Sequence, residues 1–409
     1  MDILLKNVII DESNKVVDVL AKDGIITEIG ENLEAGNAKV YDGGKHVLIP
    51  GLVESHIHLD KALIADRLPN KSGTLKEALE VTGKLKSTFT REDIRDRATR
   101  ALEMLIKNGT TYVRTHSEFD PVGGFHGFET IMELKEKYKK VIEMQVVAFP
   151  QEGIIKSPGT EEMMHRAMEM GADIVGGVPY NDTSAEKHID IVFEIAKKYG
   201  KDIDLHQDFK DGPEGQSIEY LCRKTIAEGY TGRVSVGHLT SLGGMPTDQL
   251  KPIIELMAKA QISVMSLPMT DLHLGGRNDD FNVRRAITPI RKLRDGGVNV
   301  VLASNNIRNP FTPYGNGDMM LLAAVAIAAG HLGGADDLPT VLPMLTTGPA
   351  KALKLEKYGI GVGNKATFVL LDSTRYQESL IDVPAKLLVV KDGNVTVELK
   401  KELNRLYTV

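Results

Sequence analysis

The middle of the chain alternates short runs of β-forming residues with longer amphipathic or alanine-rich segments. The eight runs are 47–58, 110–116, 141–149, 172–178, 202–208, 233–239, 262–268 and 298–304. Segments with a helical pattern, such as 90–109 and 189–200, lie between them. Eight such units over roughly 300 residues predict a (β/α)8 barrel. Because the active site of such a barrel lies at the carboxyl ends of its strands, the polar residues that end these runs are the candidate site residues.

The two ends of the chain have a different pattern. Residues 1–50 contain short β-rich runs separated by Asn, Asp and Gly, which favour turns. The same pattern returns after the glycine-rich segment 359–365. We therefore predict that residues 1–50 and 361–409 form one small β-sandwich domain, and that residues 51–360 form the barrel.

Composition and charge argue against several classes of function. The 50 Lys and Arg residues against 56 Asp and Glu residues give a net charge of -6, with no basic excess for nucleic acid or anionic lipid. The longest apolar stretch, 319–330, is about half of the roughly 20 residues that a membrane span needs, and it predicts a buried helix. A single cysteine, Cys222, and a start without signal-peptide features indicate the cytoplasm. We expect a homo-oligomer that acts on a small molecule.

Four histidines end three of the predicted strands. His56 and His58 end the first run, and because side chains alternate along a strand, both imidazoles point to the same side. His206 ends the fifth run and His238 the sixth. Each of these histidines alone is as well explained by core packing. Together they predict a metal site, since three protein nitrogens and an open position suit a catalytic zinc or iron ion.

A set of motifs on these strands carries a family resemblance. In chain order they read PGLVESHIHLDK, VRTH, AFPQEG, DLHQD, VGHL, HLGGR and SNNIRNPFTPYGNGDM. With them the chain resembles the cytosine deaminase-like branch of the amidohydrolase superfamily over nearly its whole length. Members of that branch combine a metal-dependent (β/α)8 barrel with a β-sandwich formed by both termini. They hydrolyse C–N bonds of small nitrogen heterocycles.

The resemblance implies roles for the residues that end the strands. His56, His58 and His206 would be metal ligands, and His238 would orient the attacking water or polarise the leaving centre. Gln151, in AFPQEG, matches the glutamine that binds the cyclic amide of a pyrimidine, with an ordinary loop glutamine as the alternative. The fourth run offers no lysine to bridge two metals, so we expect one divalent ion, zinc or iron.

Three further residues are candidates for substrate binding. Lys61, in HLDK, matches the part of the branch that includes the isopropylammelide amidohydrolase of triazine degradation. There it would supply positive charge to a ring oxygen, and the alternative is a solvated lysine. Phe311 follows the last strand and could stack on a ring, and Asn306 completes this group.

Two positions depart from the family's pattern. Phe209 stands three residues after His206, where cytosine deaminases carry a proton-shuttling glutamate; Asp208 is the substitute candidate, with a structural carboxylate as the alternative. Asn305 stands where the family has an aspartate that ligates the metal and takes a proton from the attacking water. An amide cannot accept that proton, whether the replacement is natural or was introduced deliberately. Strand alternation would place Asn306 on the opposite side from Asn305.

The sequence thus predicts a metal-dependent hydrolase of a C–N bond in a small nitrogen heterocycle, by cytosine deaminase-like deamination or by amine or amide hydrolysis. Asn305 would impair turnover by this chain. The loss of the proton-shuttling glutamate, where Phe209 stands, argues against cytosine itself as the substrate. One alternative is a substituted-triazine amine hydrolase, which Lys61 and Phe209 favour. The other is a non-catalytic amidohydrolase-fold binding protein, which Asn305 and Phe209 favour and the retained histidines oppose.

Overall fold

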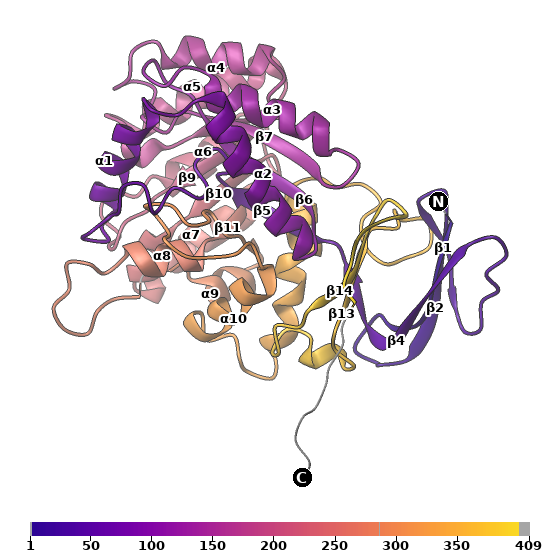
Figure 1. The fold of residues 1–409 in the computed structure, drawn as a ribbon. Helices are drawn as coiled ribbons and strands as arrows, with labels where there is room; N and C mark the ends of the chain where they lie inside the picture. The colour runs from indigo at the N-terminus through magenta and orange to yellow at the C-terminus, as the bar shows by residue number, and fades with distance from the viewer. Residues whose placement is uncertain (1, 286, 401–409) are drawn as a thin grey trace. The chain divides into compact units, whose positions relative to one another are not determined.

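The predicted eight-stranded barrel is present in the computed structural model, which describes residues 2–285 and 287–400 (Figure 1). Its strands lie in the sheet in chain order. They are β5 (Leu52–Ile57), β6 (Thr110–Glu118), β7 (Glu143–Phe149), β8 (Ile174–Gly177), β9 (Asp202–Gln207), β10 (Val234–His238), β11 (Ser263–Ser266) and β12 (Asn299–Leu302). Each predicted run contains one of these strands. The first run is divided between two strands, because β4 ends at Pro50 and β5 begins at Leu52.

Helices follow the strands, as the alternation predicts. They are α1 (Leu75–Lys86), α2 (Arg91–Lys107), α3 (His126–Tyr138), α4 (Thr160–Glu169), α5 (Ala185–Tyr199), α6 (Ile218–Ala227), α7 (Thr247–Ala260), α8 (Pro268–Leu274), α9 (Ile290–Asp295), α10 (Met319–Ala329) and α11 (Thr347–Ala352). Helix α5 shows how the sequence sets the ends: the Ser184 side chain accepts from the Lys187 amide, and Gly200 ends the helix at a φ of 66°.

The apolar stretch near residue 320 forms helix α10, which begins at the capping residue Asp318. The helix buries Met319, Met320 and Leu322, so the predicted buried helix is confirmed. Among the described residues, no helix combines the length and the apolar character that crossing a bilayer requires.

The barrel closes between its first and last strands just beyond β12. The Asn305 amide donates to the His56 carbonyl at 2.8 Å, and the Asn305 carbonyl accepts from the His58 amide at 2.9 Å. Just before these residues on the same two segments, the buried Glu54 carboxylate accepts from the backbone amide and the hydroxyl of Ser304. Closure therefore brings the end of the last strand against the pair of histidines at the end of the first.

A buried ion pair crosses the barrel interior below these residues. Arg114 on β6 donates to the Asp204 carboxylate on β9 at 2.8 Å, and the side chains are 2% and 0% exposed. The two strands are not neighbours in the sheet, so the pair links distant parts of the barrel wall. Neither residue was singled out from the sequence, because both lie inside strand runs and not at their ends.

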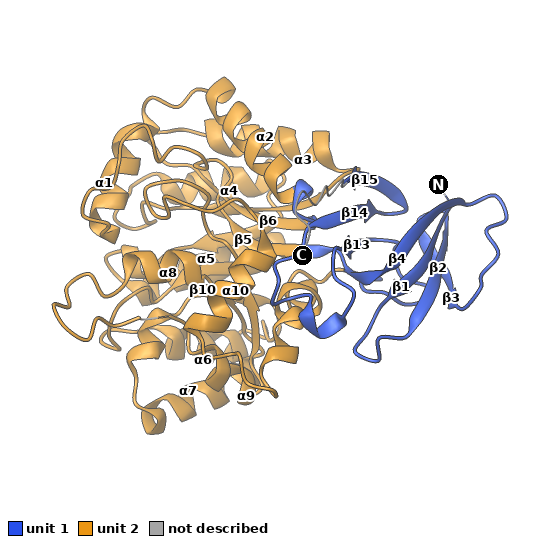
Figure 2. Ribbon diagram, turned by 60° about the horizontal axis from the view of Figure 1, so that its bottom comes forward, with its two compact units in different colours: residues 1–52, 106–111, 356–409 blue, residues 53–105, 112–355 orange. Residues whose placement is uncertain are grey.

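The two ends of the chain form a second compact unit, coloured blue in Figure 2, from the described parts of residues 1–52, 106–111 and 356–409. Its strands are β1 (Ile3–Ile9), β2 (Val16–Lys22), β3 (Ile25–Gly30), β4 (Lys39–Pro50), β13 (Phe368–Leu371), β14 (Lys386–Lys391) and β15 (Asn394–Glu398). They form one mixed sheet in the order β15-β14-β13-β4-β1-β2-β3. The predicted domain boundaries at 50/51 and 360/361 stay a prediction.

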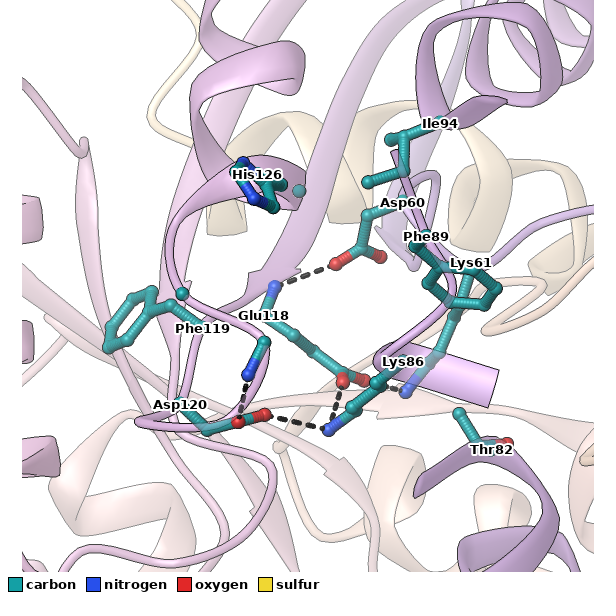
Figure 3. Close-up of a pocket in the computed structure, with 13 residues that line it drawn as sticks. Asp60, Lys61, Thr82, Lys86, Phe89, Ile94, Glu118, Phe119, Asp120 and His126 are labelled. Atoms are coloured by element: carbon teal, nitrogen blue, oxygen red, sulfur yellow. Dashed lines mark hydrogen bonds and ion pairs between the residues drawn. The ribbon is translucent and has the colours of Figure 1, made fainter. Parts of the chain in front are cut away.

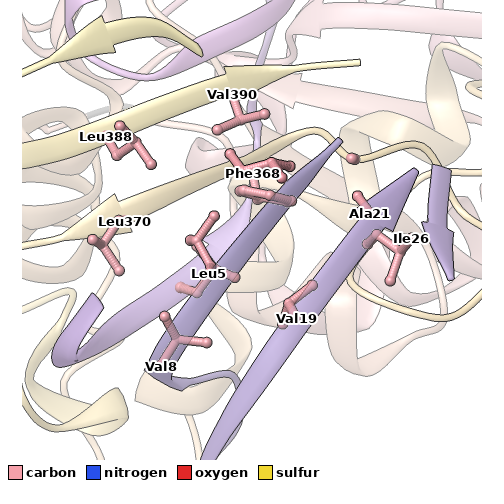
Figure 4. Close-up of a cluster of buried hydrophobic side chains, with 12 residues drawn as sticks. Leu5, Val8, Val19, Ala21, Ile26, Phe368, Leu370, Leu388 and Val390 are labelled. Atoms are coloured by element: carbon pink, nitrogen blue, oxygen red, sulfur yellow. The ribbon is translucent and has the colours of Figure 1, made fainter. Parts of the chain in front are cut away.

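The long strand β4 joins the two halves of this sheet. Its first part pairs with β1 in parallel, and its last residues pair with β13 in antiparallel fashion. Buried side chains of both halves, among them Leu5, Val19, Phe368 and Val390, form one hydrophobic cluster (Figure 4). The predicted fold class, a (β/α)8 barrel with a small β domain from both termini, is confirmed. Because β4 pairs with β1 and with β13, the strands of this β domain belong to one continuous sheet.

Candidate metal centre and active site

Three of the predicted histidines converge at the carboxyl ends of β5 and β9. The Nε2 atom of His206 lies 3.2 Å from Nε2 of His56 and 2.9 Å from Nε2 of His58. The three rings are buried. Their ligand atoms thus face one point, which is the spacing that three ligands of one ion require.

The environment keeps these rings in the form that binds metals. Burial lowers the pKa of His56, His58 and His206 well below the ordinary histidine value, and neighbouring positive groups lower it further. The rings are therefore neutral at neutral pH and offer nitrogen lone pairs. The donor set fits a single divalent transition metal.

A second group of potential ligands shares His56 with the first and adds His116 and Asp204. Its carboxylate is already engaged, since Asp204 accepts from Arg114 at 2.8 Å and lies 3.3 Å from Nε2 of His116. Asp204 and His116 therefore support the ring of His56 from below. The expectation of one metal stays a prediction.

Asn305 lies beside the three histidines and lines the same cavity. Its backbone adopts a φ of 61°, a left-handed conformation that asparagine tolerates better than most residues. Within the described part of the chain, its side-chain Oδ1 has no hydrogen-bond partner. A buried amide oxygen without a partner, next to three converging imidazoles, is in place to serve as a weak fourth ligand.

His238, at the end of β10, lines the cavity as well, and its Nδ1 atom lies 2.7 Å from the Asp271 carboxylate. Burial raises the pKa of Asp271, while His238 opposes that shift. Because Asp271 occupies Nδ1, Nε2 is the nitrogen left for a ligand in the cavity. Asp271 was missed from the sequence, although its place just after the seventh strand run was a usable signal.

Gln151 and Lys61 form another wall of the cavity. The Lys61 ammonium donates to Gln151 Oε1 at 2.8 Å and also to the Glu118 carboxylate. It lies 4.8 Å from the centre of the Phe311 ring, which lines the cavity too. The structure thus brings three of the four predicted substrate-binding residues, Gln151, Lys61 and Phe311, together, and it adds Glu118, which the sequence analysis did not single out.

Asp208 and Phe209, which follow His206 in the sequence, lie in different places. The Asp208 carboxylate accepts from the amides of Ser217 and Ile218 and from the Ser217 hydroxyl, at the start of α6. Among the described residues that line the cavity, Asp208 does not occur, whereas Phe209 does, with its ring 4.9 Å from that of His238. These contacts favour the structural alternative for Asp208.

Asn306 does not point away from Asn305, as strand alternation had led us to expect. Both residues line the cavity. Strand β12 ends at Leu302, and the positive φ of Asn305 breaks the period of two, so that expectation is wrong. The Asn306 side-chain oxygen accepts from Asn309 at 2.6 Å.

Comparison with known proteins assigns this barrel and its site to a family. A family model described as "Amidohydrolase family" matches residues 64–397. N-isopropylammelide isopropyl amidohydrolase of Pseudomonas sp. (strain ADP) is 31% identical, covering 97% of each chain, and pterin deaminase of Rhizobium rhizogenes is 30% identical, covering 96% of this chain and 90% of the other. The structure of 5-methylcytosine deaminase from Klebsiella pneumoniae, liganded with 5-fluorocytosine, matches with a TM-score of 0.93 and 31% identity over 99% of both chains. The chain belongs to the amidohydrolase family and is a hydrolase of non-peptide C–N bonds.

Proposed function

We propose that the protein removes an amine from an oxo-substituted nitrogen heterocycle, with an amino-triazine favoured over cytosine. The observation that carries this proposal is the pair of Lys61 and Gln151 on the wall of the histidine cavity. The names of the similar proteins, which include an ammelide amidohydrolase and a pterin deaminase, support a ring of this kind.

The contact between Lys61 and Gln151 fixes which atoms a ring would meet. An ammonium group has only donors, so the Gln151 atom that lies 2.8 Å from it must be the carbonyl oxygen. That leaves the amide N–H group of Gln151 for the ligand. Lys61 and Gln151 together then present donors, which suit a ring edge with a carbonyl oxygen and a deprotonated nitrogen. Cytosine presents a donor and an acceptor on its cyclic amide edge and would pair less well.

Lys61 acts in this arrangement as a fixed positive charge and not as a proton donor. Burial acts to raise the pKa of its partner Glu118, but the ammonium groups of Lys61 and Lys86 outweigh burial and hold that pKa at about 2. Glu118 therefore remains anionic and pairs with the Lys61 ammonium. A fixed cation beside the ring stabilises a substrate that carries negative charge on its oxygen.

The remaining groups supply the chemistry. His56, His58 and His206 would hold a divalent ion, which when bound would supply Lewis-acid activation of water. His238 is oriented by Asp271 at Nδ1 and presents Nε2 to the cavity, where the neutral ring accepts a hydrogen bond from the water and the protonated ring donates one to the atom on which charge develops. Asn305 can hold the water by its amide but cannot take its proton, so we infer that turnover by this chain is impaired.

We predict that the purified protein holds about one divalent metal per chain, because three imidazoles face one point. Elemental analysis after dialysis measures the content. His206→Ala should lose the ion, whereas His165→Ala, on helix α4 outside the cluster, should retain it. Two ions per chain, or metal retained after His56→Ala combined with His206→Ala, would contradict this assignment.

We also predict that Gln151→Ala weakens binding of barbiturate or cyanurate by about 1 to 3 kcal/mol, because the ring's acceptor atoms lose their donor. Calorimetric titration measures the dissociation constants. Gln151→Glu is the sharper variant, since it keeps an oxygen for Lys61 but replaces the N–H donor with an acceptor. It should weaken binding at least as much. Unchanged affinity in both variants would return Gln151 to an ordinary loop residue.

A non-catalytic binding protein is the second candidate, and the neutral side chain of Asn305 favours it. The three converging histidines and the ordered pair of Lys61 and Gln151 favour an enzyme, because a protein that only binds a ring has no need of a metal site. The two candidates differ in their response to a restored carboxylate at position 305.

A further inference from the structure

Lys61 also lines a second cavity, shown in Figure 3, which the proposed reaction does not use. Its polar walls come from Asp60, Thr82, Lys86, Glu118 and Asp120. Figure 3 shows Glu118 between the two lysines, with Asp60 reaching toward the same space. The aromatic and aliphatic side chains of Phe89, Ile94 and Phe119 complete the lining.

Two buried acceptor atoms of this cavity have no hydrogen-bond partner among the described residues: Asp60 Oδ1 and Thr82 Oγ1. Their residues are 5% and 2% exposed. The other Asp60 oxygen is satisfied, since it accepts from the Glu118 amide at 2.7 Å. Buried polar atoms in native proteins are nearly always paired, so two orphans on the same cavity indicate a ligand that donates hydrogen bonds.

The charges on the lining point to a cation. Three carboxylates, on Asp60, Glu118 and Asp120, face two ammonium groups, on Lys61 and Lys86. Glu118 pairs with both lysines, and Lys86 also lies 3.3 Å from Asp120, so these four groups compensate one another. The negative charge of Asp60 is the one left over.

The nearby Arg97 lies close enough to interact electrostatically with Asp60, but its hydrogen bonds go to groups other than the Asp60 carboxylate. Its guanidinium donates to the backbone carbonyls of Asp60 and Ala62, at 2.9 and 2.8 Å, and pairs with the Asp93 carboxylate at 3.0 Å. The Asp60 carboxylate thus faces the cavity with one oxygen unpaired.

The spacing of the acidic groups favours an organic cation over a metal ion. Within the described ranges, the sets of three His, Cys, Asp or Glu ligand atoms close enough for one ion all lie at the histidine cluster and do not include Asp60, Glu118 or Asp120. An ammonium group needs only acceptors for its N–H bonds, and the phenyl rings of Phe89 and Phe119 can accommodate a short alkyl group.

We propose that this second cavity binds a small protonated amine, ammonium or a short alkylammonium ion, whose N–H groups donate to Asp60 Oδ1 and Thr82 Oγ1. That the ion is the amine released from the ring rests on the proposed function. Lys61 lines both cavities, so its side chain is a shared wall between the ring site and this second cavity.

Direct binding tests the site without turnover. The metal-loaded full chain is titrated with ammonium chloride and isopropylammonium chloride against equal sodium chloride, and its melting temperature is followed. Crystals soaked in rubidium chloride, an ammonium-sized cation with an anomalous signal, locate the ion. We expect a higher melting temperature in both ammonium salts and a rubidium peak beside Asp60. Thr82→Val, which removes one acceptor at nearly constant volume, should raise the apparent dissociation constant roughly fivefold.

Asp60→Asn should abolish ammonium binding. If Asp60→Asn does not fold, the weaker binding expected of Thr82→Val still decides the test. The control Glu152→Gln alters a half-exposed partner of Lys86 outside the cavity lining and should bind ammonium as the unmodified chain does. Equal melting temperatures in ammonium and sodium, with no rubidium at Asp60, would overturn the proposal.

Turnover then distinguishes the site from the proposed function. In the Asn305→Asp background, ammonium should inhibit amine release, and adding Thr82→Val should weaken that inhibition if the released amine occupies this cavity. Equal inhibition with and without Thr82→Val would overturn the assignment of the ion as the product. Ammonium binding in a protein that shows no hydrolase activity even as Asn305→Asp would leave the site standing and refute the proposed function. Hydrolysis without ammonium binding would refute the site and leave the proposed function standing.

Discussion

Replacing Asn305 by aspartate should raise turnover by roughly 10² or more, the size of effect typical of a general base. The residue lies beside the three histidines, and its Oδ1 atom is free of hydrogen bonds within the residues that the structure describes. An aspartate fits the same space and supplies a charge that can take a proton from the attacking water. The assay uses metal-loaded protein with amino-triazines, amino-pyrimidines and pterins, and follows release of ammonia or amine.

The control is Asn306→Asp, which adds the same charge one residue later in the same cavity. There the side-chain oxygen already accepts from Asn309 at 2.6 Å, so a carboxylate at this position is engaged by that donor and should not rescue turnover. Melting temperatures of both variants should stay close to that of the unmodified chain, since Asn and Asp have nearly equal volumes. If Asn305→Asp binds a ring but turns nothing over, the protein is a binding protein. If the unmodified chain is already fast, Asn305 does not replace an essential proton carrier.

The sequence predicted those parts of the site that depend on strand period and strand ends. His56, His58 and His206 follow this rule, because residues at the carboxyl ends of barrel strands meet at one face. Their convergence could be anticipated without coordinates. The prediction of Gln151 and Lys61 depended on a family motif. The motif did not reveal that Lys61 donates to the side-chain oxygen of Gln151, which leaves the amide N–H group of Gln151 for a ring.

The parts that could not be predicted depend on contacts between distant segments or on irregular backbone. Asp271 holds His238 across 33 positions, and Glu54 ties β5 to Ser304 across 250. Neither pairing leaves a periodic signal in the sequence. The positive φ of Asn305 cancels the alternation that had placed Asn306 on the far side. The contacts of Asp208 could not be foreseen for a related reason, since the turn that follows β9 directs its carboxylate to the start of α6, which favours its structural alternative.

Replacing Arg114 by leucine should lower the free energy of unfolding by about 3 to 5 kcal/mol, because it leaves the buried Asp204 carboxylate without its cation. Urea unfolding of metal-free protein measures the loss. The matched control is Arg100→Leu, which removes an exposed pair with Asp96 whose side chains are 58% and 69% exposed. The control should change stability by no more than about 0.5 kcal/mol. Equal losses in the two variants would contradict the role given to the buried pair.

The pH dependence of that loss provides a second test. Burial acts to raise the pKa of Asp204, but His116 and Arg114 outweigh it and hold the pKa below the usual aspartate value. In the unmodified chain the ionised carboxylate therefore stabilises the fold above its unfolded pKa, and this contribution disappears as pH falls through the folded pKa. Without Arg114, one of the two groups that lower the pKa of Asp204 is gone, so that pKa should rise above the usual aspartate value. The loss in free energy of unfolding caused by Arg114→Leu should then become smaller as pH falls. Because Asp204 also supports His116 and lies 3.9 Å from Nδ1 of His56, the same variant should bind its metal more weakly, which would tie the stability of the barrel interior to the metal site above it.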